Sequence, residues 1–117
     1  MARILNISSD ASLLRTREEL LKSEGVEVVS ALGFEAAVQA AKACQYDLAI
    51  LGHSIPREEK RKLAYEIKRC GAEIQLLSLQ RHDSVPLPEA DFSMDAAEGP
   101  AALIALVRKI LRSQPPN

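Results

Sequence analysis

The chain has 117 residues, which is enough for one hydrophobic core and too few for two. Hydrophobic residues make up 47% of it and charged residues 26%, with a formal net charge of −1, the balance of an ordinary soluble domain. A pI near 6.1 gives no attraction for nucleic acid, and no apolar run is long enough for a membrane span or a signal peptide. We therefore expect a cytoplasmic domain over residues 1–112 and a polar tail over 113–117, with neither nucleic acid nor a membrane as partner.

The beginning of the chain predicts a strand followed by a helix. Residues 3–7 are mostly apolar, and Ser8, Ser9 and Asp10 follow as a cluster of helix N-cap residues. Leucines then recur at three- and four-residue spacing, which predicts an amphipathic helix that ends at Gly25.

The middle of the chain continues the alternation. β-Branched residues predict a second strand over residues 26–29, followed by a connection over 30–33 and an alanine-rich helix that begins near Phe34. Residues 46–51 end in four consecutive apolar side chains, so we expect a central strand that is covered on both faces. Pro56 starts a third helix, because a proline in the first helical turn sacrifices no hydrogen bond.

The last part of the chain predicts two strands and two helices. In the third helix, over residues 57–70, basic and acidic side chains are interleaved, and we favour a solvated face over a docking surface. The basic side chains of this helix are Arg57, Lys60, Arg61, Lys62, Lys68 and Arg69. Strands are predicted over 73–78 and 90–94, whereas 79–89 contains two prolines and no helical period, so we expect no full helix there. A broad apolar face after Pro100 predicts the final helix.

The two cysteines, Cys44 and Cys70, lie far apart and have no metal-ligand spacing. We expect reduced, packed thiols, and neither a metal nor another cofactor.

Five strands that alternate with helices predict a parallel sheet with helices on both faces. Six stretches also follow one another at familiar intervals: ARILNI (2–7), DASL (10–13), EGVEV (24–28), GFEAA (33–37), YDLAIL (46–51) and ADF (90–92). Together they resemble the receiver domains of bacterial response regulators (CheY-like). The resemblance implies an α/β, flavodoxin-like three-layer sandwich with a five-stranded parallel sheet of order 2-1-3-4-5, and with the fourth helix shortened or missing.

The resemblance also shows which functional residues of receivers are absent here. Ser8 and Ser9 occupy the places of the magnesium-binding acidic pair, and hydroxyls bind that cation poorly. Gly52 stands at the position of the phosphoacceptor aspartate, and the lysine after the fifth strand falls on Asp95 or on the next residue. Ser78 matches the hydroxyl that hydrogen-bonds the phosphoryl group.

We therefore predict a pseudo-receiver, not an enzyme, that acts as a protein-interaction module in two-component signal transduction or a phosphorelay, with a protein partner or a second copy of itself. Val85 and Leu87 are predicted to be exposed beside the final helix as an interaction surface; the alternative is that they close the core. A second candidate function is small-ligand sensing in the crevice at the carboxyl ends of the strands. A hydrolase built on His53 and Ser54 is a distant third, because the chain lacks the spacing of known nucleophile motifs.

Overall fold

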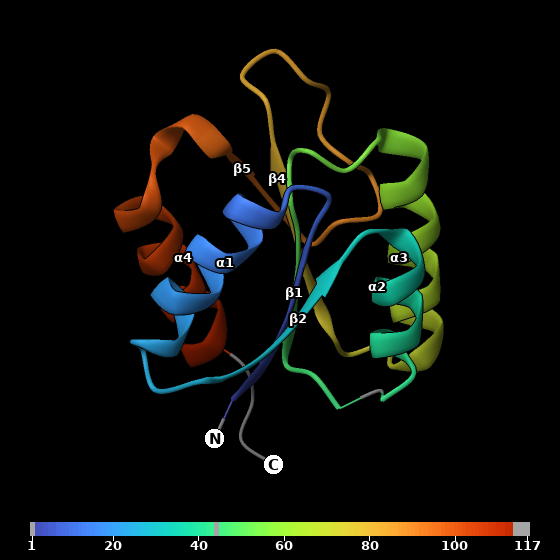
Figure 1. Ribbon diagram of the computed structural model, residues 1–117, viewed down its shortest axis with the longest axis horizontal. Helices are drawn as coiled ribbons and strands as arrows, with labels where there is room; N and C mark the ends of the chain where they lie inside the picture. Colours follow the sequence, from blue (N-terminus) through green and yellow to red (C-terminus); the bar gives the residue numbers. More distant parts are fainter. Residues whose placement is uncertain (1, 44, 114–117) are drawn as a thin grey trace.

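The computed structural model describes residues 2–43 and 45–113, which form a three-layer α/β sandwich (Figure 1). In chain order the elements are β1 (Arg3–Ser8), α1 (Ala11–Lys22), β2 (Glu27–Leu32), α2 (Phe34–Ala41), β3 (Leu48–Leu51), α3 (Arg57–Cys70), β4 (Gln75–Gln80), β5 (Phe92–Asp95), the 3-10 turn η1 (Ala96–Glu98) and α4 (Pro100–Arg112). All strand pairs are parallel and the order is β2-β1-β3-β4-β5, which confirms the predicted fold class. The predicted tail lies, beyond Ser113, outside the described residues.

The core has two halves, one on each face of the sheet. Ala49 and Leu51 of β3 pack on the side of α2 and α3, whereas Leu48 and Ile50 pack on the side of α1 and α4. All four side chains are buried, because successive residues of a strand point to opposite faces and both faces are covered by helices.

The first helix begins as the sequence predicts. The Asp10 carboxylate accepts a hydrogen bond of 3.0 Å from the backbone N–H of Leu13, which confirms Asp10 as its N-cap. Gly99 precedes the final helix with φ of 91°, a conformation that a glycine adopts without strain.

Several strand boundaries differ from the sequence-based expectation. Strand β2 continues to Leu32, although residues 30–33 were expected to form a connection. Pairing with β1 explains the extension, because Asn6, Ile7 and Ser8 continue the ladder opposite residues 30–32. Strands β4 and β5 each begin two residues later than predicted. Asp91, the residue before β5, accepts a hydrogen bond from the Leu76 N–H through its carboxylate.

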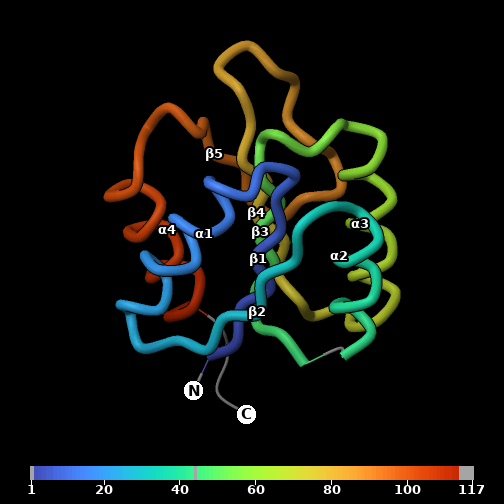
Figure 2. The backbone as a smooth tube through the Cα atoms, viewed as in Figure 1, coloured from blue at the N-terminus to red at the C-terminus, as the bar shows by residue number. Residues whose placement is uncertain are grey.

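The connection between β4 and β5 corrects the prediction for Leu87. Residues 81–91 form no helix; they rise above the sheet and return along α3 (Figure 2). Val85 is 70% exposed, but Leu87 is only 3% exposed and belongs to the half of the core that contains α2 and α3. The loop is also tied to α3 rather than to the final helix, since Arg57 donates to the Val85 carbonyl over 2.8 Å. Leu87 is buried because no helix fills this part of the surface, so an apolar loop side chain covers it.

The cysteines and the lengths of the helices bear on two further expectations. Cys70 is disulfide-bonded, which contradicts the expected reduced thiol; Cys44 lies outside the described residues. Within residues 2–43 and 45–113, no helix has the length and apolar character needed to cross a membrane.

Candidate functional site

Ser8, Gly52 and Ser78 lie close together where the three inner strands β1, β3 and β4 approach their carboxyl ends, and we call this place the strand-end site. Leu51 pairs with Ile7 on one side and with Ser78 on the other, and the Gly52 N–H donates to the Ile7 carbonyl over 3.0 Å. In a doubly wound sheet the crevice outside these strand ends is where ligands bind.

Hydroxyl groups occupy the place where the resemblance expects an acidic pair. The buried Ser8 Oγ lies 3.2 Å from Ser54 Oγ and accepts a hydrogen bond of 3.0 Å from the Asp10 N–H. Ser54 Oγ also accepts from the Ser9 N–H over 3.2 Å. The Asp10 carboxylate caps α1 and does not substitute for the missing pair. This cluster is neutral and offers no carboxylate oxygen to a divalent cation.

Arg17 of α1 occupies the space beside Gly52, and sequence reasoning missed its role. Its side chain is only 7% exposed, and its Nη1 donates to Asn6 Oδ1 over 3.0 Å and to the Ile7 carbonyl over 3.2 Å. Burial lowers the pKa of Arg17 to about 10, so the guanidinium stays charged at neutral pH. The available signal was that position 17 falls within the leucine spacing that marks the buried stripe of this helix.

Gly52 leaves room for this guanidinium. A Cβ at that position would lie 3.0 Å from the Ile7 carbonyl oxygen and 3.2 Å from Arg17 Nη2. A side chain at position 52 and the present position of Arg17 therefore compete for the same space.

Lys60 corrects a second expectation, because it is buried rather than placed on a solvated helix face. The side chain is 6% exposed, and its Nζ donates to Ser78 Oγ over 2.9 Å and to the Leu79 carbonyl. Burial, with a smaller contribution from Arg57 and Arg17, lowers the pKa of Lys60 to about 8. A lysine thus reaches Ser78 from α3, whereas the resemblance places one after β5.

Asp95, the predicted lysine-equivalent, has a local structural role. Its carboxylate accepts a hydrogen bond of 2.9 Å from the Ala97 N–H and caps η1. The same carboxylate lies 3.3 Å from Nδ1 of the exposed His82, and the Ala97 hydrogen bond and His82 hold the pKa of Asp95 below its usual value.

A pocket of about 440 Å³ opens beside Lys60, between the first turn of α3 and the loop after β4, and we call it the cationic pocket. Its lining residues are His53, Ile55, Arg57, Lys60, Ser78, Gln80, Arg81, Ser84, Val85 and Leu87. Three of them, Arg57, Lys60 and Arg81, have basic side chains, and none has a carboxylate. The pocket therefore has an uncompensated positive charge.

His53 lies at the edge of this pocket, and its surroundings disfavour the protonated ring. Burial is the largest cause of its lowered pKa, followed by the charges of Arg17, Arg81 and Lys60. Within the described part of the chain, its buried Nδ1 has no hydrogen-bond partner, and no hydrogen bond joins His53 to Ser54. Ser54 is engaged with Ser8, the last residue of β1, and with Ser9, so His53 and Ser54 do not have the arrangement of a nucleophile with its base.

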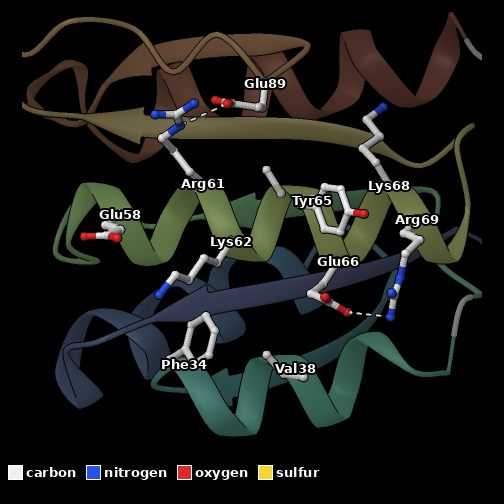
Figure 3. Close-up of a pocket in the computed structure, with 11 residues that line it drawn as sticks. Phe34, Val38, Glu58, Arg61, Lys62, Tyr65, Glu66, Lys68, Arg69 and Glu89 are labelled. Carbon is white, nitrogen blue, oxygen red and sulfur yellow. Dashed lines mark hydrogen bonds and ion pairs between the residues drawn. The ribbon is translucent and has the colours of Figure 1, made fainter.

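A larger hollow of about 1040 Å³, the α2–α3 groove, lies on the helical face that Figure 3 shows. Phe34 and Val38 of α2 and Tyr65 of α3 are among its lining residues, and Tyr65 is 63% exposed. Arg69 is positioned 6.0 Å from the Tyr65 ring and pairs with Glu66 over 3.2 Å. The groove contains none of the residues of the strand-end site. An exposed aromatic ring with a charged rim is a surface suited to a protein partner rather than to catalysis.

Among the comparisons with known proteins, only that with solved structures finds similar architectures. No protein-family model and no curated protein sequence matches this chain. A CheY-like response regulator receiver domain protein from Methanospirillum hungatei JF-1 superimposes with a TM-score of 0.84 at 19% identity, over 96% of this chain and 94% of that one. A two-component response regulator from Clostridium difficile gives 0.82 at 19% identity, over 97% and 98% of the two chains. The response regulator TrrA from Thermotoga maritima, solved with Mg²⁺-BeF, gives 0.81 at 24% identity, over 94% and 99%. The sheet order, the helical layers and these superpositions lead to one conclusion: this chain has the fold of the CheY-like receiver domains of response regulators.

Proposed function

We propose that this protein is a pseudo-receiver, a cytoplasmic signalling module that binds a protein partner without forming an aspartyl phosphate. The observation that carries the proposal is the Arg17 guanidinium beside Gly52, within 3.2 Å of where a side chain at that position would begin.

The chemistry of phosphoryl transfer supports this proposal. An aspartyl phosphate needs a carboxylate nucleophile and a divalent cation that neutralises the transferring group. Gly52 supplies no nucleophile, and the hydroxyls of Ser8 and Ser54 supply no charge to hold Mg²⁺. The positive charge of Arg17 further repels a divalent cation from the same space.

A partner-binding role is supported by the α2–α3 groove. Its exposed Tyr65 is the kind of side chain that anchors protein interfaces, and Arg69 adds a charged rim. The Thermotoga response regulator TrrA, which is 25% identical over 95% of this chain with a TM-score of 0.79, has been solved in complex with the histidine kinase ThkA. We propose that this chain likewise binds a signalling protein or a second copy of itself.

Incubation with acetyl phosphate and Mg²⁺, followed by intact-mass measurement under denaturing conditions, tests the absence of the phosphoryl switch. We expect no added phosphoryl group, and no rise in melting temperature with Mg²⁺ alone. Gly52→Asp should also remain unphosphorylated, because no acidic pair binds the metal beside the new carboxylate. A phosphoryl adduct on the unmodified sequence that hydroxylamine removes would contradict the proposal.

The docking face is tested by comparing Tyr65→Asp with Val85→Asp, the exposed residue of the loop surface that the sequence predicted. We expect Tyr65→Asp to weaken self-association or partner capture about tenfold, as loss of an interface anchor does, with unchanged circular dichroism. Val85→Asp serves as the matched exposed control. Loss of association in Val85→Asp alone would move the interface to the loop after β4.

A further inference from the structure

The two most buried cationic side chains of the described chain, Arg17 and Lys60, have no carboxylate partner. The ion pairs within residues 2–43 and 45–113 involve other cations, all of them more exposed. A buried charge without a counterion is costly, so its surroundings require an explanation.

The two cations differ in what surrounds them. Arg17 is packed against the backbone of β1 and beside Gly52. Lys60 instead borders the cationic pocket, and its two hydrogen-bond acceptors, Ser78 and Leu79, leave one of its three N–H donors for another group.

The other polar groups of the pocket also suit an anion. Arg81 is exposed at the pocket and Ser84 adds a hydroxyl. The buried His53 Nδ1, which has no partner among the described residues, donates a hydrogen bond when it carries the proton. Gln80 also lines the pocket and adds a side-chain amide.

We propose that the cationic pocket binds, without covalent chemistry, the phosphate group of a small phosphate-bearing molecule, with Lys60, Arg81 and His53 as its charged and donor ligands. The anion supplies the counterion that Lys60 lacks. This binding is independent of an aspartyl phosphate, and it goes beyond the proposed pseudo-receiver role.

Binding should change the protonation of His53, which gives a direct readout. The chain has two histidines, and His82 is exposed outside the pocket, so it is an internal control. Imidazole resonances followed by NMR against pH, in phosphate and in chloride of equal ionic strength, should show a higher His53 pKa in phosphate and little change for His82. Equal titration of His53 in both salts would overturn the proposal.

Variants assign the site. Lys60→Met should reduce the affinity for inorganic phosphate at least about tenfold, and Arg81→Gln about threefold, since charge-assisted hydrogen bonds are lost. Lys109→Met removes an exposed cation of α4 and should leave the affinity unchanged. Arg81 is exposed, so its variant tests the pocket even if Lys60→Met folds poorly. Unchanged phosphate affinity in Arg81→Gln or in a Lys60→Met variant that folds, or a similar loss in Lys109→Met, would refute the site.

A final comparison identifies the source of the phosphate group. Inorganic phosphate, sulfate and a nucleoside monophosphate are titrated by calorimetry at constant ionic strength. Tighter binding of the nucleotide supports an organic phosphate as the ligand, and equal binding of phosphate and the nucleotide supports the free ion. Failure of all three anions to bind would overturn the proposal while leaving the absence of aspartyl phosphorylation untouched.

Discussion

Arg17 and Lys60 are both buried, both lack a carboxylate partner, and lie on different sides of the strand-end site. Arg17 is surrounded by protein: Asn6 and the Ile7 carbonyl accept its hydrogen bonds, and Gly52 leaves just enough room for it. Lys60 has protein acceptors on one side and an open pocket on the other. The difference shows that the same kind of charge has a structural role where its acceptors are all internal, and leaves a candidate ligand site where a cavity remains beside it.

Of the variants considered, truncation of Arg17 should lower the free energy of unfolding most. Arg17→Ala leaves Asn6 Oδ1 without this donor, removes one of the two donors to the Ile7 carbonyl and opens a cavity beside Gly52, so we expect a loss of about 3 kcal/mol in unfolding free energy. Urea denaturation measures this. Arg17→Met, which fills more of the space, should lose less. A loss below about 1 kcal/mol for the alanine variant would show that the guanidinium does not support the site.

The charge of Lys60 should appear in the pH dependence of stability. Its pKa is lowered from 10.5 to about 8, so between these pH values the unfolded chain binds more protons than the folded one. Stability should therefore rise with pH in this window, and the charged amine is a cost below it. The contribution is about 1–2 kcal/mol, reduced from the full linkage value because the amine borders an open pocket.

The control for that measurement is Lys60→Met, which has no titrating amine. The unfolding free energy of the unmodified protein should rise by this amount relative to that of Lys60→Met from pH 8 to pH 10, because the other groups titrate in both. A constant difference across the window would mean that Lys60 has an ordinary pKa.

Substitutions at Gly52 should give the smallest effect and separate packing from charge. Gly52→Ala places a Cβ against the Ile7 carbonyl and Arg17, and we expect it to cost about 1 kcal/mol. Gly52→Asp introduces the same Cβ contact, but its carboxylate is attracted by the Arg17 guanidinium. It should therefore be more stable than the alanine variant by about 0.5 kcal/mol at neutral pH. The advantage should disappear when Arg17→Met is combined with it. An aspartate variant less stable than the alanine variant would contradict the placement of the guanidinium.

Local sequence determined most of the architecture. The apolar residues 48–51 predicted a strand covered on both faces, and the N-cap Asp10 predicted the start of α1, because both signals act over a few residues. The two prolines after β4 correctly indicated that no full helix forms there. The order of the strands came from the resemblance to receivers rather than from composition, and the structure confirms it.

The sequence also brought Ser8, Gly52 and Ser78 to one edge, since parallel strands end on the same side. Only the tertiary structure decided which side chains fill the space at these strand ends. Arg17 and Lys60 come from α1 and α3, and each reaches its acceptors across 10 to 19 positions in sequence, a relation that no local pattern encodes. The burial of Leu87 was decided in the same way: whether a loop leucine is exposed depends on which surface the neighbouring elements leave uncovered, and here that surface lies beside α3.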